Sequence, residues 1–368
     1  MNRKVLVAMS GGIDSSVSAV LLKEAGYDVA GVFMRHGIHA ESTGRPGKQG
    51  CCSVSDAYDA RRVADLLGIP FYVLNFEAEF GRIIDYFVDS YDRGSTPNPC
   101  IRCNRDLKFG KLFEYADSIG AEKVATGHYA QVESRDGRFV LRRGVDPRKD
   151  QSYVLFPLAQ AQLARCLFPI GGLEKPAVRE IARRASLRIA DKPESQEICF
   201  VPNDDHRVLL REKLGDRVKE GDFVTAEGQV VGRHPGHQFF TIGQRRGLGI
   251  ALGRPAYVVA IDPEQNRVVV GSDDELRSTE FGVEETNWID QRPSDPVRAT
   301  VKIRYNGPGA EATVEAGEEG RAWVRFDEPQ RAVTPGQAAV FYRGDEVLGG
   351  GWIRAREAVE EKLLPSSS

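Results

Sequence analysis

A short glycine-containing turn near the N-terminus constrains this chain most. The run Ser10-Gly11-Gly12-Ile13-Asp14-Ser15-Ser16 follows directly after the apolar stretch 5–9. A strand that passes through adjacent glycines into a helix turns successive backbone N–H groups inward, at a helix N-terminus that already favours anions. The turn therefore predicts a phosphate-binding site, and we interpret its ligand as ATP.

The residues of the turn indicate which class of nucleotide-binding site it forms. The Gly-x-x-x-x-Gly-Lys-Ser/Thr and Gly-x-Gly-x-x-Gly patterns are both missing from it. A carboxylate beside phosphates repels them unless a hard divalent cation lies between, so we interpret Asp14 as a Mg²⁺ contact. Ser-Gly-Gly-x-Asp-Ser resembles the PP-loop of the ATP pyrophosphatases, which implies cleavage of ATP between its α- and β-phosphates.

The order of the expected elements predicts an α/β domain followed by β-rich segments. Strand and helix signals alternate over the first 130 residues, which favours a doubly wound parallel sheet. After Gly221 short strands alternate with turns, including one expected at 238–242, and a second β-rich set begins near Val297. We expect a catalytic domain over 1–210, a small central domain over 211–280 and a C-terminal β-barrel over 281–368.

Composition excludes several classes of protein. The 368 residues include no signal-peptide pattern and no apolar run of about 20 residues, so we expect a cytoplasmic protein without a membrane segment. The net charge of −3 gives no global attraction to nucleic acid, which leaves local basic patches for that role. Those patches are Arg102, Arg105, Lys108 and Lys111; Arg142, Arg143, Arg148 and Lys149; and Arg245 and Arg246.

Six cysteines in so long a chain favour thiol or metal chemistry over a disulfide framework. In Thr96-Pro97-Asn98-Pro99-Cys100-Ile101-Arg102-Cys103-Asn104, a loop with two prolines leads into a helix whose expected cap is Asn104 or a neighbouring residue. A thiol at a helix N-terminus beside arginines has a lowered pKa, so Cys103 is the expected nucleophile. A second thiol, Cys199, stands alone in a polar segment, and Cys166 is interpreted as a packing residue.

Rival interpretations of these thiols stay open. Cys100 and Cys103 could form half of a structural zinc site, but a second Cys/His pair is missing. A thioredoxin-like motif conflicts with the fold that the glycine turn predicts. An iron–sulfur cluster on Cys100, Cys103 and Cys199 has the required three thiolates. The role of Cys51 and Cys52 has no physical explanation.

Further motifs, in a fixed order along nearly the whole chain, resemble the bacterial tRNA-specific 2-thiouridylases, the MnmA/TrmU family of the PP-loop ATP pyrophosphatase superfamily. These motifs are Ala-Thr-Gly-His-Tyr, Lys-Asp-Gln-Ser-Tyr, Ile-Cys-Phe, Gly-Gln-Arg-Arg-Gly-Leu-Gly-Ile, Arg-Tyr and Thr-Pro-Gly-Gln. Where some members have an aspartate, this chain has Cys100. The acid/base role proposed for that aspartate is therefore not carried over.

The resemblance assigns roles residue by residue. It implies an ATP site lined by Ala8, Met9, Ser10, Gly11, Gly12, Ile13, Asp14, Ser15, Met34 and Gly127. The target base is implied to meet Asn98, Pro99 and Cys100. Other implied tRNA contacts are His128, Lys149, Asp150, Gln151, Arg304, Tyr305 and Gln337.

The resemblance also implies a reaction, in which sulfur replaces the C2 oxygen of the wobble uridine of a tRNA. ATP converts that oxygen into a leaving group, with Mg²⁺ and the glycine turn stabilising the pyrophosphate. Cys199 carries a persulfide from an external donor, a cysteine desulfurase or a persulfide relay protein, and Cys103 attacks it. The two sulfurs must then come within bonding distance in at least one state.

Two other functional classes stay open. An amide-forming or other PP-loop ligase needs no paired thiols, so serine at Cys103 or Cys199 would leave its turnover unchanged. A nucleotide-gated RNA-binding protein with a structural metal would release no pyrophosphate when tRNA, ATP and a sulfur donor are added.

Overall fold

The computed structural model describes residues 4–37, 54–190, 192, 198–201 and 205–355. Its internal contacts divide the chain into two compact units. The first comprises Met1–Ile84, Pro99–Asp204 and Asp345–Leu348, and the second comprises Asp85–Asn98, Asp205–Gly344 and Gly349–Ser368. The units therefore do not follow the linear order of the chain, because a segment that precedes Cys100 belongs with the C-terminal half.

The first unit contains the predicted parallel sheet. Its strands are ordered β3-β2-β1-β4-β7, and every neighbouring pair is parallel. They span Lys4–Ala8 (β1), Asp28–Arg35 (β2), Phe71–Asn75 (β3), Lys123–Ala125 (β4) and Cys166–Leu167 (β7). Sequence analysis missed β7, because two residues are too few to show a pattern. The predicted packing role of Cys166 is confirmed, since it is buried in this strand.

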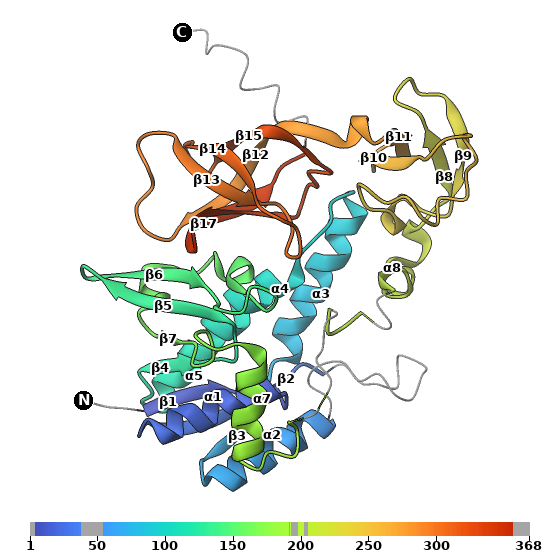
Figure 1. Ribbon diagram of the computed structural model, residues 1–368. Coiled ribbons are helices and arrows are strands. Elements are labelled where there is room, and N and C mark those ends of the chain that lie inside the picture. Colours follow the sequence, from blue (N-terminus) through green and yellow to red (C-terminus); the bar gives the residue numbers. More distant parts are fainter. Residues whose placement is uncertain (1–3, 38–53, 191, 193–197, 202–204, 356–368) are drawn as a thin grey trace. The chain divides into compact units, whose positions relative to one another are not determined.

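Both faces of the central strand are covered, which confirms the doubly wound fold. Val5 and Val7 of β1 join one hydrophobic core with residues of α1 (Ile13–Glu24), α2 (Val54–Leu67) and α7 (Lys175–Arg184). Leu6 points to the opposite face by the alternation of a strand and is equally buried. Figure 1 shows α1 and α7 together beside β1.

The helix that carries Cys103 begins earlier than predicted. We expected it to start near Asn104, but α4 (Pro99–Arg102) passes directly into the π-helix η2 (Cys103–Lys111) and then α5 (Leu112–Ser118). Proline fits the first turn of a helix, where its missing N–H costs nothing. Asn104 is not a cap but an interior residue, and its amide donates to the carbonyl of Val154 at 3.1 Å.

A hairpin was also missed in the first unit. Strands β5 (Ala130–Arg135) and β6 (Arg138–Arg143) pair antiparallel across Asp136-Gly137. Both turn residues have positive φ, 52° and 77°, as a two-residue Asp-Gly hairpin turn requires. The dipeptide signal was present in the sequence. The described residues of this unit also form η3 (Ser152–Leu155), α6 (Gln160–Leu163) and the first part of α3 (Glu77–Asp92).

The second unit begins with the end of α3 (Glu77–Asp92) and continues with α8 (His206–Leu214) and a four-stranded sheet. That sheet has the order β10-β11-β8-β9, with bounds Gly221–Val224 (β8), Val230–His234 (β9), Tyr257–Asp262 (β10) and Arg267–Gly271 (β11). The strand expected at 238–242 is wrong, because η6 (His237–Phe239) lies there. The His237 ring forms a hydrogen bond with the Asp92 carbonyl, and the Gln238 amide donates to the Asp92 carboxylate. These tertiary contacts therefore decide the local conformation.

Six antiparallel strands form the C-terminal β-barrel, which confirms its prediction. Their order is β12-β15-β14-β13-β16-β17, and β12 also pairs with β17 to close the barrel. The strands span Arg277–Trp288 (β12), Val297–Lys302 (β13), Ala310–Ala316 (β14), Ala322–Arg331 (β15), Ala338–Arg343 (β16) and Glu346–Ile353 (β17). β12 was missed by sequence analysis, although it closes the barrel.

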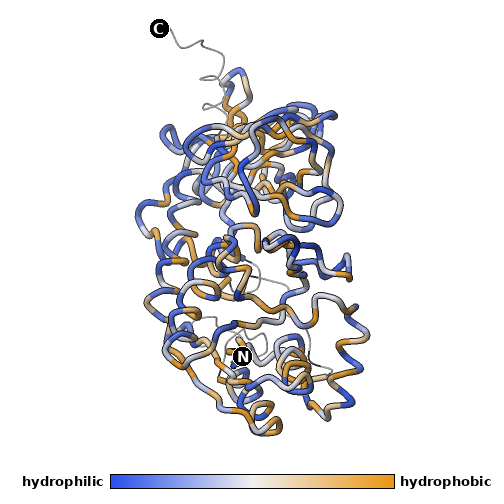
Figure 2. The backbone as a smooth tube through the Cα atoms, turned by 90° about the vertical axis from the view of Figure 1, so that its left-hand side faces the viewer, coloured by the Kyte–Doolittle hydropathy of each residue, from blue (hydrophilic) through white to orange (hydrophobic). Residues whose placement is uncertain are grey.

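Hydrophobic and hydrophilic segments alternate along the described chain in Figure 2, without one long hydrophobic stretch. Consistent with this pattern, none of the helices in the described part of the chain is long and apolar enough to cross a membrane.

Candidate active site

The glycine turn connects β1 to α1 at the carboxyl edge of the parallel sheet. Met9 N–H donates to the Val32 carbonyl, which holds the start of the turn against β2. Gly11 has a φ of +74°, and a Cβ there would lie 2.3 Å from the Asp56 carbonyl oxygen. Only glycine fits this position. Gly127 approaches the turn from β4, since its Cβ would lie 2.6 Å from the backbone nitrogen of Ser15.

The side chains of the turn do not all point toward a possible ligand. The Ser15 hydroxyl accepts from Ser10 N–H at 3.1 Å and donates to the Gly12 carbonyl at 3.2 Å, so it braces the turn internally. Met9 and Ile13 are buried in the core with 1% and 3% exposure. Of these two residues, therefore, the backbone and not the side chain can face a nucleotide.

Asp14 is engaged by groups that sequence analysis did not identify. Lys175 Nζ lies 2.7 Å from Oδ1 and 2.9 Å from Oδ2, and the Tyr129 hydroxyl donates to Oδ1 at 2.7 Å. Lys175 is at the start of α7 and is buried. A buried lysine needs a carboxylate partner, but the sequence does not indicate that the partner of Lys175 is Asp14.

The carboxylate of Asp14 still fits the predicted Mg²⁺. A carboxylate can accept about four hydrogen bonds, and Oδ2 receives one from the described residues while Oδ1 receives two. Mg²⁺ commonly binds one or two protein carboxylates together with substrate phosphates. Asp14 would therefore share the ion with a bound triphosphate.

Cys103 lies in the second turn of its helix, and burial raises the pKa of its thiol, with Lys108 opposing that effect and Asp106 adding to it. The expectation of a lowered pKa is therefore wrong for this conformation. The helix dipole acts mainly on the first turn, where Cys100 lies exposed.

Cys199 is held in a separate turn at the same edge of the sheet. Val201 N–H donates to the Ile198 carbonyl, and Cys199 between them is partly exposed. The next residue, Phe200, is buried with its ring edge-on to Phe80 at 5.7 Å. Phe80 in turn stacks on His36, which follows the carboxyl end of β2. Aromatic contacts therefore anchor the turn of Cys199 beside β2.

The segments that carry the two thiols contact residues that follow different strands of the parallel sheet. The π-helix of Cys103 packs beside the end of β4, because Phe109 contacts the His128 ring at a centroid distance of 5.9 Å. Strands β2 and β4 flank β1 in the sheet. Both cysteines are thiols in this structure, and their approach to bonding distance stays a prediction.

The iron–sulfur alternative finds no support in the described residues. Among them no group of three or more His, Cys, Asp or Glu side chains is placed to hold a metal ion, so Cys100, Cys103 and Cys199 do not form a ligand set. Cys51 and Cys52 lie outside the described residues.

Several residues expected to contact tRNA have structural partners. His128 is buried with Nδ1 2.6 Å from the Thr126 hydroxyl, and burial lowers the pKa of its imidazole well below the ordinary value. The Gln151 amide oxygen accepts from Tyr129 N–H, and Asp150 accepts from the N–H groups of Gly144 and Ser152. These side chains brace the end of β4 and the hairpin after it.

The remaining members of the predicted set are placed as follows. Met34 and Lys149 are partly buried in the first unit, and Asn98 and Tyr305 are partly buried in the second. Arg304 donates to the Ala332 carbonyl at 2.8 Å. Gln337 donates to the carbonyls of Thr96 and Pro97, at 3.0 and 3.3 Å. Arg142 forms ion pairs with Asp345 and Glu133, so it adds little free positive charge to the basic patch predicted around it.

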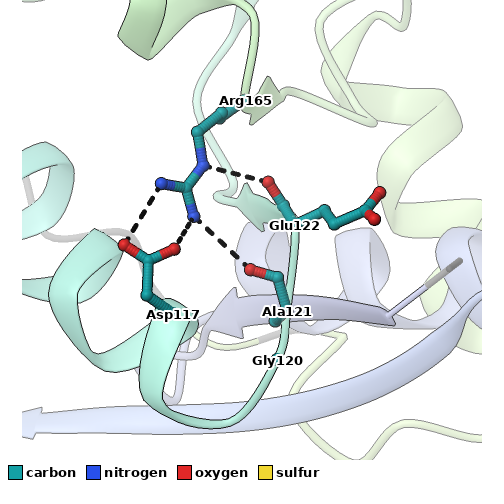
Figure 3. Close-up of a pocket in the computed structure, with 5 residues that line it drawn as sticks. All are labelled: Asp117, Gly120, Ala121, Glu122 and Arg165. Atoms are coloured by element: carbon teal, nitrogen blue, oxygen red, sulfur yellow. Dashed lines mark hydrogen bonds and ion pairs between the residues drawn. The ribbon is translucent and has the colours of Figure 1, made fainter.

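A surface hollow of about 480 Å³ lies away from this site, at the amino end of β4. Figure 3 shows Arg165 there, bonded to the Asp117 carboxylate and to the carbonyls of Ala121 and Glu122. Ligands of such sheets bind at the opposite, carboxyl edge. The hollow is therefore a structural cluster and not the candidate site.

Family models agree with this architecture. Three family models match the chain: the tRNA methyl transferase HUP domain over residues 3–203, the tRNA methyl transferase PRC-barrel domain over 208–272 and the aminomethyltransferase beta-barrel domain over 278–353. A solved NMN synthetase from Francisella tularensis matches 53% of this chain and 66% of its own, with 18% identity and a TM-score of 0.32.

The curated relatives match almost end to end. The tRNA-specific 2-thiouridylase MnmA of Carboxydothermus hydrogenoformans is 53% identical over 361 residues, which cover 96% of this chain and 98% of the relative. Its namesake in Geobacter metallireducens is 51% identical over 357 residues, with 96% and 97% coverage. Given the parallel sheet, the glycine turn and these full-length matches, the chain belongs to the tRNA-specific 2-thiouridylase family.

Proposed function

We propose that this protein is an ATP-dependent tRNA sulfurtransferase that converts the wobble uridine to 2-thiouridine, in the cytoplasm. The observation that supports the proposal is that the two thiol-bearing segments contact residues that follow β2 and β4, the strands next to β1. The printed name of the relatives, at about half identity over nearly the whole chain, supports the same reaction.

The first step activates the uridine. Its C2 oxygen attacks the α-phosphorus of ATP, pyrophosphate leaves, and AMP remains on the oxygen. The N–H groups of the turn and the N-terminus of α1 favour the negative charge that develops on the departing phosphates. Mg²⁺, held by Asp14 and the phosphates, would add charge stabilisation.

The second step delivers sulfur. A cysteine desulfurase or a persulfide relay protein loads Cys199 as a persulfide. The Cys103 thiolate attacks the Cys199 sulfur, a Cys103–Cys199 disulfide forms, and hydrosulfide leaves. Hydrosulfide then adds to C2 and displaces AMP. A dithiol reductant gives two electrons and two protons to the disulfide and restores both thiols.

We assign the tRNA contacts to residues that the family resemblance selects. Asn98, Pro99 and Cys100 would meet the extruded base, since an anticodon base leaves its stack cheaply. Lys149, Arg304 and Tyr305 would bind phosphate or stack. Asp150, Gln151 and Gln337 would act through the backbone segments that they brace.

Nucleoside mass spectrometry of tRNA tests the proposal. The protein is incubated with tRNA, ATP, Mg²⁺ and a sulfide or persulfide source, and the wobble uridine is expected to gain the mass of sulfur in place of oxygen. Cys199→Ser and Cys103→Ser should abolish persulfide-dependent product, while the buried thiol variant Cys166→Ala should retain it. Product formed equally by both serine variants would refute thiolation through these cysteines.

A further inference from the structure

Lys192 binds the glycine turn from a segment far along the chain. Its Nζ donates to the Gly11 carbonyl at 3.0 Å, to Asp56 Oδ1 at 2.7 Å and to Asp59 Oδ2 at 2.6 Å. An ammonium group has three protons, so these three acceptors satisfy it completely. The side chain is 29% exposed and Asp56 is 11% exposed, so the cluster is largely removed from water.

The backbone of Lys192 is fixed as well. Its N–H donates to the Ile189 carbonyl, and Ile189 and Ala190 belong to the core of the first unit. Arg179 of α7 also donates to the Ala190 carbonyl at 2.8 Å. The ammonium group therefore approaches Gly11 from a rigid support.

The bond to Gly11 fixes one peptide plane of the turn. In a trans peptide the carbonyl and the following N–H point in opposite directions, and the described chain has no cis peptide. Because the Gly11 carbonyl faces Lys192, the Gly12 N–H faces away from it. Gly12 is the N-cap of α1, so this N–H joins the groups that can meet an anion.

The charges around Gly11 make the lysine necessary. Asp56 and Asp59 bring two negative charges to the turn, and Lys192 is the cation that both bind. Burial alone would lower the pKa of Lys192, but its hydrogen bonds to the two carboxylates raise it, so the ammonium form persists. Without Lys192, both carboxylates would lose this cation beside the phosphate site.

We propose that Lys192 is a positioning residue for the triphosphate: it orients the Gly11–Gly12 peptide toward the phosphates and neutralises Asp56 and Asp59 beside them. This inference rests on the proposed use of ATP. It does not require Lys192 to touch the nucleotide, and it predicts an effect on phosphate binding that spares the adenosine part.

Calorimetric binding of Mg-ATP and of adenosine to the full chain tests this role. Lys192→Met should raise the Kd of Mg-ATP about tenfold and leave the Kd of adenosine unchanged. Lys192→Arg should retain most of the ATP affinity, because a cation remains. Lys111→Met, which removes another lysine paired with a carboxylate, should change neither Kd.

A triple variant separates the two contributions. Lys192→Met/Asp56→Asn/Asp59→Asn should bind ATP more tightly than Lys192→Met, because the two negative charges are gone. It should still bind ATP more weakly than the unaltered protein, because the Gly11–Gly12 peptide is no longer held by Lys192. Thermal unfolding checks that each variant is folded.

The outcomes distinguish this inference from the proposed function. If the unaltered protein binds ATP no better than adenosine, the proposed function fails. If it prefers ATP and Lys192→Met keeps the same preference, or loses adenosine equally, only the role of Lys192 is overturned.

Discussion

Single side chains from distant segments hold the glycine turn in shape. Lys175 binds the carboxylate of Asp14, and Lys192 binds the carbonyl of Gly11. Because these bonds hold the turn in one shape, it loses little additional conformational entropy when a phosphate binds. Such preorganisation favours affinity for the charged part of the ligand.

Removing Lys175 should destabilise the protein. Lys175→Met leaves Asp14 without its cation, and because Asp14 is 30% exposed we expect a loss of about 1–2 kcal/mol in the free energy of unfolding. Urea denaturation measures this loss. Lys111→Met, at an exposed ion pair, should cost less than about 0.5 kcal/mol. Equal losses in the two variants would contradict the structural importance of Lys175.

The raised pKa of Cys103 gives a pH prediction. A higher pKa lowers the thiolate fraction at any given pH, so iodoacetamide should modify Cys103 more slowly than the exposed Cys100 near neutral pH. The rate at Cys103 should increase only above the ordinary titration range of a thiol. Peptide mass spectrometry across pH follows both sites. Faster modification of Cys103 at neutral pH would show that its thiolate is already stabilised.

Motifs predicted residue types at the site better than they predicted contacts. The glycine turn followed from the pattern, because backbone geometry permits few alternatives there, and the family resemblance selected Gly127, which approaches it. The pairing of Lys175 with Asp14 did not, since the two are 161 residues apart and any carboxylate could have satisfied the lysine. For the same reason the bracing role of Gln151 was invisible in the sequence.

At the scale of elements, a turn of the barrel fixes the segment that leads to the cysteine helix. Thr96 N–H donates to the Pro335 carbonyl, and Gln337 donates back to Thr96 and Pro97. Gly336 between them has a φ of +84°, and its Cβ would lie 3.0 Å from the Thr96 carbonyl oxygen. We call these contacts between Thr96–Pro97 and Pro335–Gln337 the clamp. The fold was predictable from strand and helix periodicity, but the clamp was not, because it joins irregular segments.

Two glycines allow a controlled test of this clamp. Gly336→Ala adds both backbone strain and close contacts, so we expect a loss of about 2–4 kcal/mol in stability and a lower kcat for thiolation. Gly344 also has a positive φ, +61°, but nothing lies within 4 Å of its Cβ position. Gly344→Ala should therefore cost only about 1 kcal/mol and leave kcat unchanged. Equal effects on kcat would show that the clamp is irrelevant to catalysis.

At the scale of the whole molecule, a protein with a net charge of −3 would need selected cations to bind the tRNA of the proposed function. Many arginines are neutralised, as Arg298 is by Asp327 at 2.6 Å. Arg245 and Arg246 are exposed, and neither has a carboxylate partner among the described residues. They therefore form an exposed basic pair in the second unit that can meet phosphate.

The salt dependence of tRNA binding tests this pair. Arg245→Ala/Arg246→Ala should weaken binding and reduce the slope of log K against log salt by about 1.4–1.8, as expected for two lost phosphate contacts. Arg277→Ala/Arg298→Ala removes two arginines that are already paired and should leave the slope unchanged. An unchanged slope in the first variant would exclude Arg245 and Arg246 as phosphate contacts.

The clamp between Thr96 and Gln337 also has a consequence for synthesis. The ribosome releases Thr96 long before Gln337, which follows 241 residues later. A growing polypeptide can therefore assemble its first strands early, but the stretch before Cys100 acquires its final shape only after most of the barrel has been translated. Truncated or stalled products should accordingly be inert, even when their nucleotide turn is already complete.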